Sequence, residues 1–267
     1  MAADAARSWS RALESWAIPA QILAAAPESP WTLPPAVFAR SAELAVADST
    51  GGPSRRRALE VLDAGATVLD VGVGGGAASL PLAPPAARLV GVDQSAEMLA
   101  AFARAADARG VEHVEVVGLW PDVADDVSPA DVVVCHHVAY NVADLVPFAA
   151  ALTSHARRRV VLELTAEHPR AHTRQLWREL HGIERPSRPV ASDAVAVLEE
   201  MGLDVGVEQH AEPPLLWRGT PRSEIVALLR RQLCVGPERD AEIDALLGDG
   251  PDVVARTAVT VWWDGVA

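Results

Sequence analysis

The sequence has 267 residues, of which 50% are hydrophobic and 22% charged, and its formal net charge is -13. This length is enough to bury a full core for one large domain, or one domain with added helices. The acidity argues against an extended nucleic-acid surface, which must face phosphates with positive charge. Two arginine runs, at 55–57 and 157–159, are interpreted as solvated helix faces or turns.

No run approaches the roughly 18 apolar residues of a membrane helix, and the N-terminus lacks the pattern of a signal peptide. The two cysteines, Cys135 and Cys234, are far apart, and neither has the spacing of metal ligands. All 23 residues counted as Lys or Arg are Arg, and Tyr140 and Asn141 are the only Tyr and Asn, which is typical of a GC-rich bacterial genome. We therefore expect a soluble, cytoplasmic, bacterial protein without a bound metal.

The N-terminal part of the chain predicts helices. Residues 7–26 and 34–48 have amphipathic periodicity, and a proline-rich stretch separates them. We expect residues 1–57 to form an N-terminal helical cap in front of a domain that spans residues 58–267.

From residue 66 onward, short apolar runs alternate with helical stretches, which predicts βαβ units and a parallel sheet. The expected strands are residues 67–71, 88–92, 113–117, 131–135, 159–164, 203–208 and 257–263. The fourth run does not alternate with polar residues, as expected for a strand covered on both faces. Helical additions are expected near 166–202 and at 221–247. The pattern predicts one α/β domain with inserted helices.

The most informative segment joins the first strand to a run of glycines, Val68-Leu69-Asp70-Val71-Gly72-Val73-Gly74-Gly75-Gly76, with a helix expected to begin near Ala77. Glycines permit a tight turn and let backbone N–H groups approach a nucleotide-like ligand. Gly72, Gly74 and Ala77 also satisfy the dinucleotide fingerprint, and Asp93 suits the ribose of either kind of cofactor.

Asp70 discriminates between the cofactors. It lies two residues before the first glycine, where it would repel a pyrophosphate but attract the ammonium and sulfonium of S-adenosylmethionine. The alternative interpretation is an acid that only accepts backbone N–H groups in the turn. The ligand chemistry favours the methyl donor.

Together with Val90-Gly91-Val92-Asp93-Gln94-Ser95-Ala96-Glu97-Met98-Leu99, the glycine segment resembles the first two motifs of class I S-adenosylmethionine-dependent methyltransferases. The similarity covers roughly residues 58–163. It implies a Rossmann-like methyltransferase fold, a doubly wound, mostly parallel seven-stranded sheet whose last strand is antiparallel. It also implies S-adenosylmethionine as cofactor, with these contacts: Asp70 near the methionine amino group, Gly72 and Gly74 under the cofactor, Asp93 on the ribose, and Gln94 and Met98 beside the adenine.

The sequence departs from the family after the third strand, where an acid often bonds the adenine amino group. Here Leu119 and Trp120 follow instead. Either Asp122 substitutes for the acid, or Trp120 stacks on the adenine while a backbone group meets its edge. A core or surface role for Trp120 is the alternative. The family's Lys-Pro-Gly-Gly turn before the fifth strand is also missing, and residues 154–159 replace it.

Polar side chains follow the fourth strand, at the point where the strand order of the family reverses and ligands bind. We expect His136 or His137 to act as a general base there, because histidine has a suitable pKa, with Tyr140 and Asn141 orienting the acceptor. The competing interpretation is that the histidines only bond loop carbonyls, with His136 touching the cofactor through its backbone.

The sequence therefore predicts methyl transfer from S-adenosylmethionine to a small-molecule acceptor. Oxygen is the expected site of methylation, because the Asn-Pro-Pro-Tyr type of motif found in amino-group methyltransferases is absent. Two alternatives stay open, an NAD(P)-dependent oxidoreductase and a non-catalytic binding module with this fold. We expect no nucleic-acid or membrane partner, and a homodimer stays open. His168 and His172 are four residues apart, but Pro169 lies between them and no acid or Cys completes a metal site.

Overall fold

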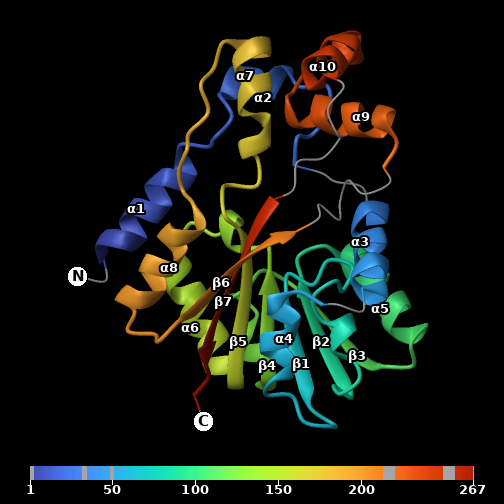
Figure 1. The fold of residues 1–267 in the computed structure, drawn as a ribbon, viewed down its shortest axis with the longest axis vertical. Coiled ribbons are helices and arrows are strands. Elements are labelled where there is room, and N and C mark those ends of the chain that lie inside the picture. The colour runs from blue at the N-terminus through green and yellow to red at the C-terminus, as the bar shows by residue number, and fades with distance from the viewer. Residues whose placement is uncertain (1–2, 32–34, 49–50, 213–219, 249–255, 267) are drawn as a thin grey trace.

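The computed structural model describes residues 3–31, 35–48, 51–212, 220–248 and 256–266. Within these residues, one sheet of seven strands has the order β3-β2-β1-β4-β5-β7-β6 (Figure 1). The strands are β1 (Thr67–Val71), β2 (Arg88–Asp93), β3 (Glu112–Val117), β4 (Ala130–His136), β5 (Ala156–Thr165), β6 (Gly206–Glu212) and β7 (Arg256–Asp264). Strand β7 is antiparallel to β5 and β6, and the other pairs are parallel. The predicted fold class is confirmed.

Strand β4 shows why the apolar runs form this sheet. Val132 and Val134 face one hydrophobic core, Val133 faces the other, and all three are buried. A strand that is covered on both faces has no position for a polar residue along its middle. The sixth strand begins three residues later than predicted, at Gly206.

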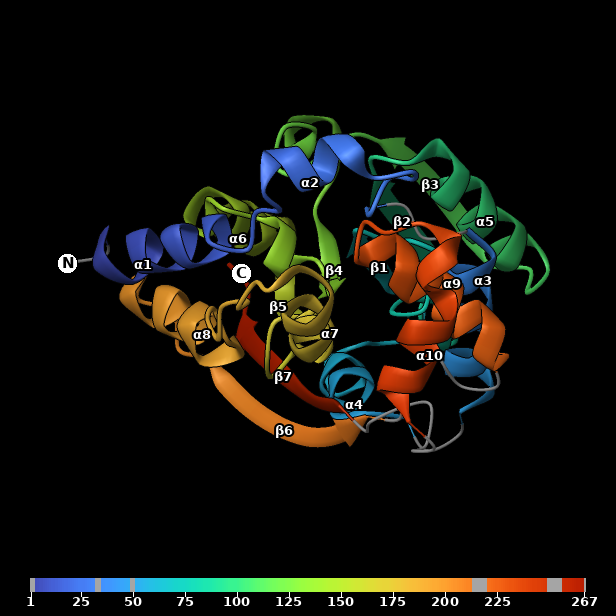
Figure 2. The ribbon, with the colours of Figure 1, turned by 90° about the horizontal axis from the view of Figure 1, so that it is seen from above.

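Helices cover both faces of the sheet. One face is packed by α1 (Ala3–Glu14), α6 (Leu145–His155) and α8 (Ala191–Glu200). The opposite face is packed by α3 (Pro35–Ala47), α4 (Pro53–Leu59) and α5 (Ala96–Asp107). Figure 2 shows the two groups on either side of the sheet, seen from above. Among the helices described, none is long and apolar enough to cross a membrane.

Four further helices form a separate helical lobe beyond the end of the sheet at which β5 finishes (Figure 1). They are α2 (Ala20–Ala25), α7 (Arg174–His181), α9 (Arg222–Gln232) and α10 (Asp240–Leu247). Their shared core includes Ile18, Trp177 and Leu229. Residues 1–57, predicted as one N-terminal cap, therefore contribute helices to several parts of the fold. Helices α1 and α3 lie on opposite faces of the sheet, and α2 lies in the helical lobe. Helix α4 packs against β5 and β7.

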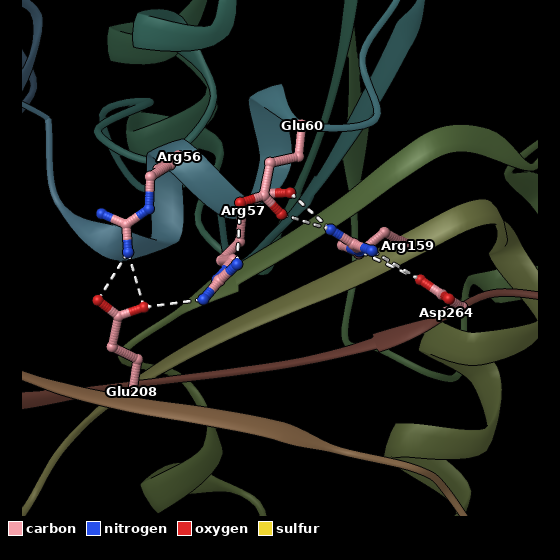
Figure 3. A network of polar contacts seen from close by, with 6 residues as sticks. All are labelled: Arg56, Arg57, Glu60, Arg159, Glu208 and Asp264. Atoms are coloured by element: carbon pink, nitrogen blue, oxygen red, sulfur yellow. Dashed lines mark hydrogen bonds and ion pairs between the residues drawn. The ribbon is translucent and has the colours of Figure 1, made fainter.

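Both arginine runs take part in an ion-pair network that holds α4 on the sheet (Figure 3). The pairs are Arg56–Glu208 at 2.6 Å, Arg57–Glu208 at 3.1 Å, Arg57–Glu60 at 2.9 Å, Arg159–Glu60 at 2.9 Å and Arg159–Asp264 at 3.0 Å. The Arg57 guanidinium also lies 4.0 Å from the ring centre of Trp262. The runs are therefore more than solvated faces, because they join α4 to β5, β6 and β7.

Candidate functional site

The glycine loop leaves β1 and lies against the segment that follows β4. Gly72 and Gly74 have φ values of +76° and +51°, in the left-handed region that side chains disfavour. A Cβ atom at Gly72 would lie 2.3 Å from Cγ2 of Val138. The loop therefore needs glycine at position 72 both for its conformation and for its close contact with the end of β4.

No α-helix follows this loop, contrary to the prediction of a helix near Ala77. The chain instead makes turns and one short 3-10 helix, η1 (Leu80–Leu82), before β2. Pro81, Pro84 and Pro85 explain the difference, because proline lacks an N–H donor and clashes with the preceding turn of an α-helix. The loop therefore presents its backbone N–H groups without the dipole of an α-helix behind them.

Helix α3 packs directly on the loop. A Cβ atom at Gly75 would lie 2.7 Å from the carbonyl oxygen of Phe38, and one at Gly74 would lie 3.6 Å from the Phe38 ring. The absence of a side chain at Gly75 is thus required by the close approach of α3. This glycine serves helix packing, whereas sequence reasoning had grouped it with the ligand loop.

Asp70 lies at the end of β1 beneath the loop, and only 1% of its surface is exposed. Its Oδ2 accepts a hydrogen bond of 2.6 Å from the Ser79 hydroxyl, while Oδ1 is buried without a partner in the described part of the chain. Burial raises the pKa of Asp70 to about 7, although hydrogen bonds from Ser79 oppose the shift. A buried acceptor without a donor is rare, so this atom fits a cationic or N–H ligand group.

Asp93 ends β2 and organises the neighbouring backbone. Its Oδ2 accepts from the Gly74 N–H at 3.0 Å, and its Oδ1 accepts from the Ser95 N–H at 2.9 Å. Gln94 is exposed next to it, and Met98 is half-buried in the first turn of α5. The glycine loop and the second motif therefore meet through one carboxylate, as the sequence resemblance implies.

A buried carboxylate lies between the two histidines at the end of β4. Glu163 of β5 is 5% exposed and pairs in register with His136. Its Oε1 lies 3.7 Å from Nδ1 of His136 and 3.4 Å from Nε2 of His137. Burial alone would raise the pKa of Glu163, but the two histidines and a Ser54 hydrogen bond outweigh it and hold the pKa below its usual value.

The two histidines differ in their surroundings. Burial lowers the pKa of His136, and its Nε2 is buried with no partner among the described residues. The side chain of His137 is 42% exposed, and its backbone adopts the left-handed conformation with φ at 60°. This conformation is strained for a residue with a side chain, and strain of this kind is concentrated at functional sites.

Ser54 of α4 donates a hydrogen bond of 2.5 Å to Oε2 of Glu163. The ion pairs of Figure 3 fix α4 to the sheet, so they also fix the position of the Ser54 hydroxyl. Glu163 consequently has its two oxygens engaged by different elements, one by α4 and one by the end of β4.

Comparisons with known proteins identify the domain that contains this site. Residues 68–159 match a family model described as a methyltransferase domain. These residues therefore form a methyltransferase domain, and they lie in a sheet whose strand order agrees with the fold that the sequence resemblance implies. The match includes the glycine loop, Asp93 and the two histidines, whereas Ser54 and Glu163 lie outside it. The match favours a methyltransferase over the oxidoreductase alternative and agrees with S-adenosylmethionine as the methyl donor.

Solved structures share the fold of this chain at low sequence identity. The YcgJ protein from Bacillus subtilis is 16% identical with a TM-score of 0.53, over 80% of this chain and 98% of that chain. A methyltransferase candidate from Bacillus halodurans is 15% identical with a TM-score of 0.53, over 81% and 100%. Magnesium protoporphyrin IX methyltransferase from Synechocystis, crystallised with bound SAH, is 16% identical with a TM-score of 0.51, over 85% and 84%. No curated protein matches the sequence.

The residues of the segment after β3 lie in different environments. Leu119 is exposed, and Asp122 is also exposed. Trp120 is buried and packs edge-on against His155, with ring centres 4.9 Å apart. This is the placement of a core aromatic, so the structure gives the predicted stacking of Trp120 on adenine no support.

Tyr140 and Asn141 separate in the same way. Tyr140 is buried, packs against Trp9 at 5.5 Å between ring centres, and donates a hydrogen bond of 2.9 Å to the Thr165 carbonyl. Its hydroxyl is therefore engaged inside the fold, which does not support the expected orienting role. Asn141 is exposed in the short helix η3 (Ala139–Asn141) that follows the histidines.

Sequence reasoning missed Glu163 and Ser54. Glu163 is a single charge within the apolar run Val160-Val161-Leu162-Glu163-Leu164, which is unusual for a strand covered on both faces. That signal was available in the sequence. Ser54 offered none, because its role depends on where α4 packs.

Proposed function

We propose that this methyltransferase methylates a hydroxyl oxygen of a small molecule, with a histidine at the end of β4 as general base. The observation that supports the proposal is the buried Glu163 carboxylate next to both His136 and His137. A carboxylate in this position orients an imidazole and stabilises the imidazolium that forms when the ring accepts a proton. The arrangement matches the needs of a hydroxyl acceptor, which loses its proton as the new C–O bond forms.

The donor side of the site is proposed to use the residues around the glycine loop. S-Adenosylmethionine supplies a methyl carbon bound to a cationic sulfur. Asp70 has the unpartnered Oδ1 that suits the donor's ammonium group. Gly72 and Gly74 leave the backbone open to close approach, and Asp93 is half-buried at the end of β2, where a ribose hydroxyl would meet it. We assign Gln94, Met98 and Leu119 to the adenine side because they are the less buried side chains there.

On the acceptor side, His136 and His137 have complementary properties. Burial lowers the pKa of His136, although the Glu163 carboxylate opposes the shift, and a lowered pKa favours the neutral imidazole that can accept a proton. His137 is the more exposed ring and is the one placed to meet an acceptor from solvent. We propose that one of this pair takes the proton and that the other helps hold Glu163 ionised.

A small, dissolved acceptor fits the surface charges better than a nucleic acid. The arginines 56, 57 and 159 of the two basic runs are paired with carboxylates, so they do not form a free phosphate-binding face. The net charge of -13 acts in the same direction. We propose that the acceptor is a metabolite of the cytoplasm.

The test uses His136→Gln, His137→Gln and Glu163→Gln, with release of SAH measured across a panel of hydroxylated small molecules. Loss of the base is expected to reduce turnover by roughly 10²- to 10⁴-fold, while SAH affinity, measured by calorimetry, changes little. His113→Gln is the matched control, because His113 lies on the edge strand β3 and pairs with Asp107 and Glu115, away from the β4 histidines. Its turnover should equal that of the wild type. Unchanged turnover in both variants of the β4 histidines would remove the base from the mechanism.

A further inference from the structure

A cluster of cations and aromatic rings lies between the end of β5 and the helical lobe. We call it the arginine–tryptophan cluster, and its members are Trp16, His168, Arg170, Arg174 and Arg185. The buried Trp16 ring stacks on His168 with ring centres 3.7 Å apart and planes 11° apart. The guanidinium groups of Arg185 and Arg174 lie 5.2 and 5.7 Å from the centre of the same ring.

Two of these guanidinium groups have no carboxylate partner among the residues that the structure describes. Arg185 is 8% exposed and donates to the carbonyls of Trp16 and Ala17, while its Nε is buried without a partner. Arg170 donates to the Pro30 carbonyl at 3.3 Å and lies 4.1 Å over the ring of Trp31. The carbonyls accept hydrogen bonds from Arg170 and Arg185, and the rings pack on their guanidinium groups, but neither kind of partner neutralises the positive charge.

This arrangement is electrostatically costly in the ligand-free protein. Buried charges are normally paired, because transfer out of water is expensive. Burial and the nearby Arg185 lower the pKa of Arg170 to about 10, and burial together with the surrounding arginines lowers the pKa of His168 to about 3. Glu167, which pairs with Arg174 at 3.2 Å, is the acid closest in sequence to Arg170, and its side chain is 64% exposed. One buried arginine, Arg185, and one half-buried arginine, Arg170, without a described carboxylate partner thus form a site suited to an anion.

Tyr140 links the cluster to the segment that carries the histidine pair. The His168 ring lies 5.3 Å from the ring of Tyr140, which follows His137 by three residues. Tyr140 in turn donates to the carbonyl of Thr165, two residues after Glu163. The strand ends that carry the proposed base therefore continue directly into the segment that carries Arg170.

We propose that Arg170 and Arg185 bind an anionic group of the methyl acceptor, a carboxylate or a phosphate. The acceptor is then a hydroxylated acid, held by its charge at the arginine–tryptophan cluster and methylated at its hydroxyl. This inference rests on the proposed function, because it concerns the acceptor of the same site. Arginine suits both anions, since its planar fork donates two parallel hydrogen bonds to a pair of oxygens.

The experiment titrates benzoate, phenyl phosphate and neutral benzamide into the enzyme with SAH present, and follows binding by ligand-observed NMR. At least one anion is expected to bind saturably, with benzamide showing no binding. The anion that binds distinguishes a carboxylate acceptor from a phosphate acceptor. Arg170→Gln should weaken that binding by roughly tenfold or more, because a charge-assisted hydrogen bond is lost.

The controls separate this inference from the proposed function. Arg178→Gln changes an exposed arginine of α7 that pairs with Glu184 at 2.7 Å, and it should bind the anion like the wild type. Arg185→Lys retains a positive charge if Arg185→Gln does not fold, and it should keep measurable binding. Wild-type protein that binds SAH but neither anion, or equal binding in Arg170→Gln and wild type, would overturn the anionic acceptor alone. Wild-type protein that does not bind SAH would overturn the proposed function.

Discussion

Replacing Asp70 by Asn tests both the electrostatics of the site and the assignment of the donor. The carboxyl is buried, with Ser79 on one oxygen and no partner described for the other. Burial raises its folded-state pKa from 3.8 to about 7. The folded protein therefore binds a proton more tightly than the unfolded chain, so stability is retained at low pH and is lost as the pH rises from about 4 to 7.

The size of this effect follows from the shift. Each pKa unit corresponds to about 1.4 kcal/mol, so a rise from 3.8 to about 7 removes at most about 4 kcal/mol of unfolding free energy by pH 8. The asparagine side chain cannot ionise, so the variant lacks this loss. If the amide oxygen accepts from Ser79, the amide NH2 group takes the place of Oδ1 and has no described partner, at a cost of about 1–3 kcal/mol at every pH. Asp70→Asn is thus expected to be the less stable protein at pH 5 and to equal or exceed the wild type at pH 8.

Urea unfolding of the ligand-free proteins between pH 5 and 8 measures these free energies, and calorimetry with SAH measures the donor site. The variant should bind SAH roughly tenfold or more weakly, because the ammonium loses its carboxylate. Asp122→Asn is the control, since Asp122 is exposed and its replacement should leave the pH profile nearly unchanged. Parallel stability profiles for Asp70→Asn and wild type would refute the buried charge, and equal SAH affinity would refute the contact with the donor.

Three further substitutions test the loop and the carboxylate. Gly75→Ala should lower the unfolding free energy by about 1–3 kcal/mol, because its Cβ would lie 2.7 Å from the Phe38 carbonyl. The control Gly110→Ala, at φ +65° with open space around it, should lower it by only about 1–2 kcal/mol. Chemical unfolding measures both free energies, and the rate of trypsin cleavage near α3 reports whether that helix is displaced. Ser54→Ala should cost about 1.5–3 kcal/mol at pH 7 in thermal or urea unfolding, since it removes the hydrogen bond to the Glu163 carboxylate. Glu163→Gln should lower the unfolding free energy by about 3–5 kcal/mol at pH 7. Because the folded-state pKa of Glu163 is lowered, the difference in unfolding free energy from wild type should shrink as the pH falls below about 4. A constant difference down to pH 3 would contradict an ionised Glu163.

The sheet followed from the sequence because its evidence is local. The central strands contain short buried apolar runs, such as Val132 to Val134, and such runs can be recognised without knowledge of the contacts between strands. The prediction of a helix near Ala77 was wrong for an equally local reason, because Pro81, Pro84 and Pro85 oppose an α-helix there. The prediction assigned Gly72 and Gly74 to the cofactor and gave Gly75 no role, whereas the structure shows that Gly75 is required by the contact with α3.

The acceptor side depended on contacts that no local pattern reports. His136 and Glu163 lie side by side because β4 and β5 pair in a register that aligns them. Ser54 reaches the Glu163 carboxylate because α4 packs on the sheet. Arg57 and Arg159 both bind Glu60 and help to hold α4 there. The same reasoning applies to Arg185, which contacts Trp16 from a distant part of the chain, and to Arg170, which contacts Pro30 and Trp31. A charge placed inside an apolar strand is the part of this arrangement that a sequence shows. Because a charge inside a buried strand needs a partner, Glu163 alone predicts polar side chains facing it from a neighbouring element, and the structure places His136, His137 and Ser54 there.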